Sequence, residues 1–69
     1  MDTLREQYEA MRDRVTLDGR PAVIIAWMQP HPIVRRAEVE SGGSVAAGGY
    51  HFSRAAIQRV LSNGGAFRS

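Results

Sequence analysis

The chain has 69 residues and no cysteine, so it can form one small domain but no disulfide. A domain of this size buries only about 60% of its unfolded surface, and its core supplies only about 3–5 kcal/mol of net stability. Two histidines without a thiolate are too few ligands for a structural zinc site. We therefore expect a single domain over residues 1–69 that gains stability from a partner chain.

The formal net charge is +2, from nine basic and seven acidic residues, and every basic residue is arginine. The excess of positive charge lies in the C-terminal part of the sequence. Residues 1–40 hold six arginines against seven acids, whereas residues 41–69 hold three arginines and no acid. Domains that bind duplex DNA usually carry a denser basic stripe. The charge therefore does not favour a dedicated duplex-binding protein.

Hydropathy indicates neither a membrane span nor a secretion signal. The longest apolar run, residues 22–28, is far shorter than the ~20 residues that cross a bilayer. The first residues are acidic and then amphipathic, unlike the basic and apolar regions of a signal peptide. We expect a cytoplasmic protein with no membrane partner.

An amphipathic helix is predicted over residues 2–17. Thr3 and Glu6 fit a capping box, in which each side chain satisfies the backbone amide of the other residue. The apolar residues recur at helical spacing and form one stripe: Leu4, Tyr8, Met11 and Val15. Asp18-Gly19 is typical of a turn, and Pro21 prevents the helix from continuing.

A strand is predicted over residues 22–29, where β-branched and aromatic residues stand between Pro21 and Pro30. Strand alternation gives it two apolar faces, formed by Val23, Ile25 and Trp27 on one side and by Ile24, Ala26 and Met28 on the other. A strand that is apolar on both faces needs cover on both faces. This strand is therefore where we expect a second chain.

A second strand is predicted over residues 33–40, after the stiff connector Gln29-Pro30-His31-Pro32. The two strands are expected to form an antiparallel hairpin with a four-residue loop. A lone two-stranded sheet is marginal in water. We therefore expect the free edge of the first strand to pair with a second copy, which would give a homodimer with a four-stranded sheet.

A glycine-rich loop is predicted over residues 41–49, where two Gly-Gly pairs flank four small residues. The glycines raise the alternative of a phosphate-binding loop. No lysine follows them, however, and the G-x-G-x-x-G pattern does not occur. A flexible loop is the favoured interpretation.

A second helix is predicted over residues 53–62. Ser53 is a good N-cap, and Phe52 and Ile57 match a hydrophobic staple. Asn63-Gly64 supplies the left-handed residue that ends a helix. On this helix Arg54, Gln58 and Arg59 are expected to face water, and residues 66–69 are expected to form a frayed tail.

The element order α-β-β-α indicates a small α+β domain in which an antiparallel hairpin packs with two helices. The sequence leaves open whether the helices share one face of the hairpin or cover one face each.

No pattern in the sequence indicates catalysis. His31 and His51 are the only side chains that titrate near neutrality in an unperturbed environment. Their spacing from serines and carboxylates predicts neither a catalytic triad nor a metal site. We predict no catalytic, cofactor-binding or metal-ligating residue, no cofactor and no enzymatic activity.

Seven residues are candidates for binding a partner, because arginine, tryptophan, tyrosine and methionine are enriched at interfaces: Trp27, Met28, Arg35, Arg36, Tyr50, Arg54 and Arg59. The first hypothesis is a non-enzymatic protein-interaction module. It would be an inhibitor or regulator from a phage or mobile element that binds and blocks a larger host protein or nucleoprotein complex. The origin in a mobile element is inferred only from the small size of the chain, which anti-CRISPR proteins share.

The alternative hypothesis is a small nucleic-acid-binding transcriptional regulator. Its arginines would pair with phosphates, while Tyr50 would stack on unpaired bases. This interpretation requires the second strand and the last helix to present their arginines on one surface.

Overall fold

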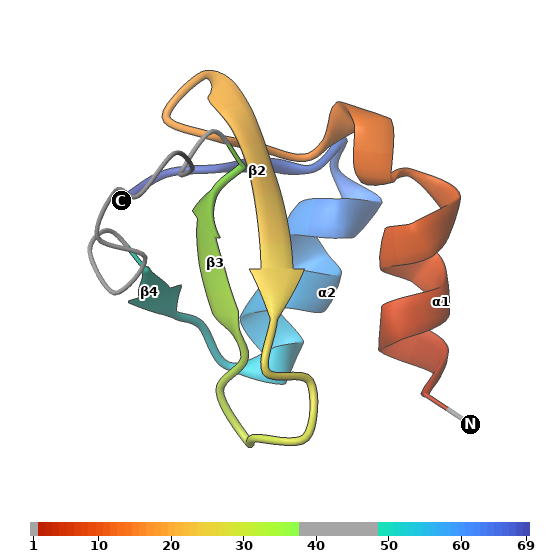
Figure 1. Cartoon of the computed structure of the whole chain (residues 1–69). Coiled ribbons are helices and arrows are strands. Elements are labelled where there is room, and N and C mark those ends of the chain that lie inside the picture. Colours follow the sequence, from red (N-terminus) through yellow and green to blue (C-terminus); the bar gives the residue numbers. More distant parts are fainter. Residues whose placement is uncertain (1, 38–48) are drawn as a thin grey trace.

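The computed structural model describes residues 2–37 and 49–69, which form two α-helices and five short strands (Figure 1). In chain order the elements are α1 (Thr3–Ala10), a 3-10 turn (Arg12–Arg14), β1 (Thr16–Leu17), β2 (Arg20–Ile25), β3 (Ile33–Arg36), β4 (Tyr50–His51), α2 (Arg54–Ser62) and β5 (Ala66–Phe67). The predicted α+β class is confirmed, although the sheet is larger than the expected hairpin.

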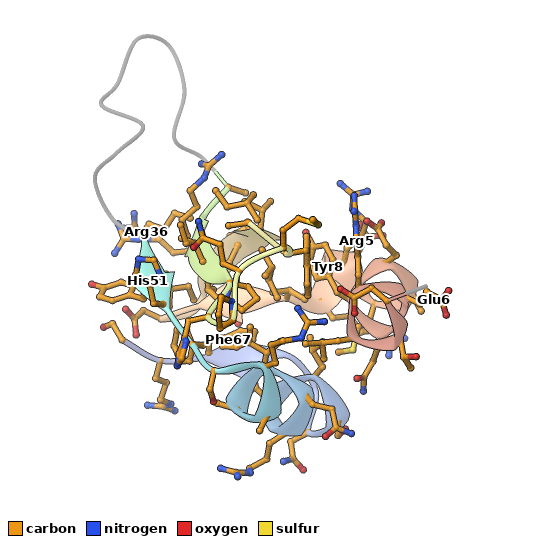
Figure 2. All side chains as sticks on the ribbon, turned by 90° about the horizontal axis from the view of Figure 1, so that it is seen from below. Arg5, Glu6, Tyr8, Arg36, His51 and Phe67 are labelled. Atoms are coloured by element: carbon orange, nitrogen blue, oxygen red, sulfur yellow. The ribbon has the colours of Figure 1, made fainter. Side chains whose placement is uncertain are left out.

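The strands form one sheet in the order β4-β3-β2-β1-β5. Neighbouring strands run antiparallel, except that β1 and β5 run parallel. The helix α2 lies against one face of this sheet, and α1 contacts α2 along the β2 side (Figures 1 and 2). The two helices are therefore on the same side, and no helix of the described residues lies on the opposite face of β2 and β3.

The core fills the space between the sheet and the helices. Every strand except β4 contributes to it, as do both helices and the segment before β1. Its buried side chains are Leu4, Tyr8, Val15, Leu17, Ala22, Ile24, Val34, Ile57, Leu61 and Phe67. The helical stripe predicted near the N-terminus is thus buried at Leu4, Tyr8 and Val15, although Val15 lies outside the helix.

The first helix is shorter than the predicted range of residues 2–17, because it ends at Ala10 and is followed by the 3-10 turn and β1. The backbone of this stretch is hydrogen-bonded within the sheet. The Thr16 amide donates to the Gly65 carbonyl at 2.9 Å, and the Val15 carbonyl accepts from the Ala22 amide at 3.0 Å. These long-range hydrogen bonds compete successfully with continued helix, so the predicted boundary was wrong.

The N-cap of α1 is Asp2 and not the predicted Thr3. One carboxylate oxygen of Asp2 accepts from the backbone amides of Leu4 and Arg5, at 3.1 and 3.3 Å. Both residues are good caps, but a carboxylate also interacts favourably with the positive end of the helix dipole.

The predicted turn at Asp18-Gly19 is confirmed, and it joins β1 to β2. Both residues have positive φ, 53° and 84°. Such a pair forms the tight two-residue turn of a hairpin, and it places Leu17 opposite Arg20. The sequence therefore contained a hairpin that precedes the predicted one.

The predicted hairpin is antiparallel as expected, but its strands are shorter and its loop is longer. β2 ends at Ile25, which pairs with Ile33, so the connection runs over residues 26–32. The chain turns out of the strand at Ala26, whose φ is +62°. β3 ends at Arg36; the rest of the predicted second strand, residues 38–40, and most of the glycine-rich loop, residues 41–48, lie outside the described residues.

The edge that was predicted to pair with a second copy is partly occupied within the chain. β1 pairs with β2 at Arg20 and Pro21, and the Ala22 amide adds its bond to Val15. The first strand thus gains its second neighbour from the same molecule. The expectation of an edge free along the whole strand was therefore wrong at its first residue, Ala22, whereas the homodimer itself stays a prediction.

The helix predicted over residues 53–62 is confirmed as α2, Arg54–Ser62, with Ser53 as its N-cap. It ends in two glycines of positive φ, Gly64 at 109° and Gly65 at 87°. The Gly65 amide donates to the Val60 carbonyl at 2.8 Å, and the Gly64 amide donates to the Leu61 carbonyl at 3.2 Å. This is the Schellman pattern, which satisfies the last carbonyls of a helix while it reverses the chain.

The predicted frayed tail over residues 66–69 was wrong, because its first two residues form β5. Phe67 is only 1% exposed and packs edge-on against Phe52, with ring centroids 5.1 Å apart. Its carbonyl accepts from the Asp18 amide at 2.9 Å. The chain reversal after α2 directs β5 toward β1, and burial of the Phe67 ring stabilises this position.

Candidate functional site

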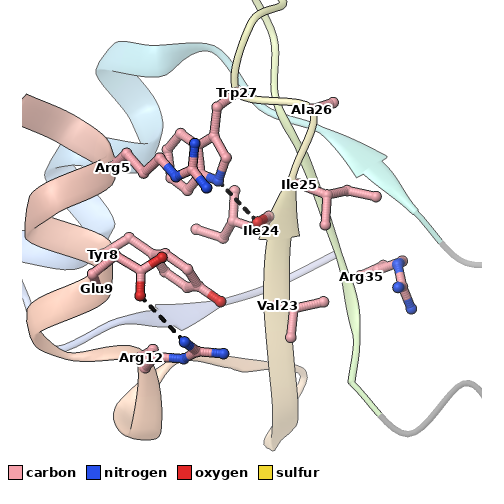
Figure 3. A pocket seen from close by; sticks show the side chains of 10 residues that line it. All are labelled: Arg5, Tyr8, Glu9, Arg12, Val23, Ile24, Ile25, Ala26, Trp27 and Arg35. Atoms are coloured by element: carbon pink, nitrogen blue, oxygen red, sulfur yellow. Dashed lines mark hydrogen bonds and ion pairs between the residues drawn. The ribbon is translucent and has the colours of Figure 1, made fainter. Parts of the chain in front are cut away.

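A groove lies between α1 and the second half of β2 (Figure 3). We call it the α1–β2 groove. Its volume is about 520 Å³, within the range of sites that bind small ligands. It is lined by Arg5, Tyr8, Glu9, Arg12, Val23, Ile24, Ile25, Ala26, Trp27 and Arg35.

Two aromatic rings form the floor of the groove. Tyr8 reaches from α1 toward β2 and is only 4% exposed, while Trp27 leans toward α1 from the end of β2 (Figure 3). Their ring centroids are 5.4 Å apart at an angle of 43°. The Trp27 indole donates to the Ile24 carbonyl at 3.0 Å, which fixes the ring after the strand has ended.

The rim of the groove carries more positive than negative charge. Glu9 and Arg12 form an ion pair at 3.2 Å on the surface of α1. Arg5 reaches from α1 into the groove (Figure 3) and forms no ion pair within the described part of the chain. Arg35 lines the groove from the β3 side. The Arg5 and Arg35 guanidinium groups therefore provide charge that Glu9 does not neutralise.

The backbone is strained at Ala26, which lines the same groove. Its φ of +62° is in the left-handed region, which costs a residue with a Cβ about 1–2 kcal/mol. The Ala26 carbonyl accepts from the Gln29 amide at 3.1 Å, so the strained residue begins a closed turn. Strain of this kind is concentrated at ligand-binding and catalytic sites.

Arg35 contributes an unsatisfied donor. Its Nε is buried and has no hydrogen-bond partner within residues 2–37 and 49–69. Its Nη1 donates to the Arg36 carbonyl at 3.3 Å. A buried donor without a partner costs about 1–3 kcal/mol, so Arg35 is a second unfavourable feature beside the groove.

Beside the groove, the side of β2 and β3 that faces away from α2 is apolar. We call this surface the open face. Strand alternation places Val23 and Ile25 opposite Arg35 and Ile33 on this side, while Ile24 faces α1 (Figure 3). Ile25 is 37% exposed, and Val23 and Ile33 are half-buried. No helix covers these side chains in the described structure.

The structure brings together only some of the predicted partner-binding residues. Trp27 and Arg35 line the α1–β2 groove, and Met28, which is 98% exposed, follows Trp27 directly. Tyr50 lies on β4, opposite Val34, and is exposed at the edge of the sheet. Arg36 is exposed at the end of β3.

Arg54 was expected to face water, and this prediction was wrong. Its Nη1 donates to the Trp27 carbonyl at 2.9 Å, and its Nη2 pairs with the carboxylate of Asp2. The hydrogen bond from Arg54 lowers the pKa of Asp2 below its ordinary value. Arg54 therefore links the start of α1 to the turn that holds Trp27.

Arg59 does not share a surface with the groove. It stands two positions after the buried Ile57, so helical geometry turns it about 200° away from the core. Arg35, on the side of the sheet away from α2, and Arg59, on the outer side of α2, therefore do not lie on one surface. The nucleic-acid hypothesis stays a prediction.

The contribution of α1 to the groove was missed by sequence reasoning. Tyr8 was assigned to the apolar stripe of the first helix, and no binding role was predicted for the charged residues Arg5, Glu9 and Arg12. The only available signal was the Glu9-to-Arg12 spacing, which favours an ion pair but does not indicate which element lies opposite.

No other chemical centre is evident in the described part of the chain. His51 Nδ1 lies 3.2 Å from the His31 carbonyl, and this contact joins β4 to the loop after β2. Within residues 2–37 and 49–69, no group of three or more His, Asp or Glu side chains is placed to hold a metal ion. The helices described there are also too short and polar to span a bilayer.

Comparison with known proteins adds no relative. No protein-family model, no curated protein and no solved structure matches this chain.

Proposed function

We propose that this chain is a non-enzymatic protein-binding module whose partner docks on the open face and the adjoining α1–β2 groove. The observation that carries the proposal is the apolar surface of β2 and β3 on the side without helices. A small domain gains little by exposing Ile25 and its neighbours to water unless another surface covers them.

The features around the groove support the same conclusion. A strained Ala26 and an Arg35 Nε without a partner among the described residues both reduce stability, yet both residues line the groove with the aromatic floor. Natural proteins break local folding rules mainly at functional sites. The origin in a mobile element and the inhibition of a host complex stay predictions, because they rest on chain size alone.

Affinity capture from lysates of the source cells, with and without nuclease treatment, tests the proposal. Ile25→Asp places a charge at the centre of the open face, and Arg59→Asp places the same charge on the exposed side of α2. We expect wild type and Arg59→Asp to retain the same protein, and Ile25→Asp to lose it while remaining folded by circular dichroism.

Two results would contradict the proposal. Capture that disappears after nuclease treatment would favour the nucleic-acid alternative. Equal capture by Ile25→Asp and wild type would show that the open face does not contact the partner.

A further inference from the structure

The charges of the α1–β2 groove select an anionic ligand. Three arginines and one glutamate line it, and the glutamate is already paired with Arg12. Arg5 and Arg35 have no acidic partner in the described structure. An arginine guanidinium binds a carboxylate or phosphate through parallel hydrogen bonds, so either kind of anion fits a single arginine of this groove.

The surroundings favour a carboxylate over a nucleic-acid backbone. Exposed acidic side chains also belong to the elements on this side of the groove: Glu9 lines it, Glu6 stands on α1, and Asp13 follows in the 3-10 turn. These would repel a run of phosphates, which needs several unopposed cations. A segment with one or two carboxylates can pair with Arg5 and Arg35 and keep its distance from the acids.

The shape of the groove favours an extended peptide. β1 accompanies β2 only as far as Ala22, so the described structure has no strand between α1 and residues 23–25. The Tyr8–Trp27 floor lies along this gap. Extended peptides bind beside strands with alternate side chains in pockets, and an apolar side chain would pack on the two rings.

We infer that the α1–β2 groove binds a short extended segment of the partner protein, in which a carboxylate pairs with Arg5 and a neighbouring apolar side chain packs on Tyr8 and Trp27. This inference rests on the proposed function and deepens it by naming the chemistry of the segment. The Arg35 guanidinium, which lines the same groove and forms no ion pair in the described structure, takes a second acceptor of the same segment.

Selection from a phage-displayed library of random heptapeptides tests this inference directly. With the wild-type chain, we expect enriched peptides to carry an aspartate or glutamate close to an aromatic or aliphatic residue. The charge-reversal variant Arg5→Glu should bind these peptides at least about tenfold more weakly, and selection on it should yield lysine or arginine at the acidic position.

The matched control is Arg59→Glu, which makes the same charge change on the side of α2 turned away from the core. It should bind the wild-type peptides with unchanged affinity. Arg5→Glu is expected to fold, because Arg5 is exposed in the first turns of α1, where acidic residues are favourable. Circular dichroism of both variants checks this.

Three results would overturn the inference: no enriched peptide, equal binding of the selected peptides by Arg5→Glu, or wild-type binding of a single-stranded oligonucleotide that Arg5→Glu loses. The last result would assign the groove to nucleic acid. The capture experiment with Ile25→Asp tests the proposed function separately. If Ile25→Asp loses the captured partner while Arg5→Glu keeps it, the protein-binding function stands and the groove inference falls.

Discussion

Residues 53–67 satisfy the local rules of helix capping and chain reversal, whereas residues 23–35 break several rules within a similar length. In the first stretch Ser53 caps α2, and two glycines of positive φ close it. In the second, a residue with a Cβ takes a left-handed conformation and an arginine donor is buried without a partner in the described structure. The first stretch acts as scaffold, and the second bears the features of a binding site.

This difference has a physical meaning. Each unfavourable feature of residues 23–35 reduces a net stability that is small for a 69-residue chain. They lie together around one groove beside an apolar surface. We interpret them as a cost that binding offsets.

Removal of the Phe67 ring should abolish stable folding. Phe67→Ala takes away a side chain that is 1% exposed and packs against Phe52. Substitutions of this kind cost about 3–5 kcal/mol, which is comparable with the whole stability expected of so small a domain. Urea denaturation followed by circular dichroism measures the loss, and a cooperative transition near that of wild type would show that β5 is not part of the scaffold.

Met28→Ala is the control for this truncation. Met28 is 98% exposed, so its loss should change the free energy of unfolding by no more than about 0.5 kcal/mol.

A Cβ at Gly64 should destabilise the scaffold through the backbone alone. Gly64 has a φ of +109°, and no heavy atom lies within 4 Å of the place a Cβ would take. Gly64→Ala therefore meets no clash, and we expect a cost of about 1–2 kcal/mol from the conformation. Thermal denaturation measures it. An unchanged melting temperature would mean that the reversal after α2 tolerates other conformations.

The opposite substitution at Ala26 should stabilise the protein. Ala26→Gly removes the penalty of the left-handed conformation, while the added freedom of the unfolded chain offsets part of the gain. We expect a net increase of about 0.5–1 kcal/mol in the free energy of unfolding, measured by urea denaturation. A loss of stability would show that residue 26 is not strained, and the contrast between the two stretches would weaken.

The smallest expected effect on stability is at Arg54 of α2. This side chain binds the Trp27 carbonyl of the other stretch and the carboxylate of Asp2. The pKa of Asp2 is lowered in the folded state, chiefly by the Arg54 hydrogen bond. Its contribution to stability is therefore present above the ordinary pKa of aspartate and is lost as the pH falls through the lowered pKa.

Asp2→Asn keeps a capping side chain and removes the charge. Denaturation curves between about pH 6 and pH 2 should show stability falling less steeply with acid in Asp2→Asn than in wild type. Parallel pH profiles would mean that the Asp2–Arg54 pair does not form in solution.

The parts of the fold that were predictable depend on neighbours in sequence. Ser53, the Phe52–Ile57 staple and Asn63-Gly64 act within a few residues, so α2 was predicted with nearly correct bounds. β5 was not, because its pairing with β1 joins residues about fifty positions apart. Val15 also fits helical spacing from Met11, which concealed that it leads into a strand.

The candidate site was half predictable for the same reason. Tryptophan and arginine are residue types enriched at interfaces, and both Trp27 and Arg35 line the groove. Arg5 and Tyr8 belong to the groove only because α1 packs next to β2, a tertiary contact with no local signal. The left-handed Ala26 also has no sequence signature, since glycine is the residue expected there.

Chemical-shift mapping on the isotope-labelled chain tests the division between binding site and scaffold most directly. Addition of a peptide from the wild-type selection should shift the Trp27 indole N–H and the backbone amides of Arg5 and Ile24. The amides of Gln58 and Arg59 on α2 should remain in place. Shifts concentrated on the exposed side of α2, with the Trp27 indole unaffected, would contradict the account.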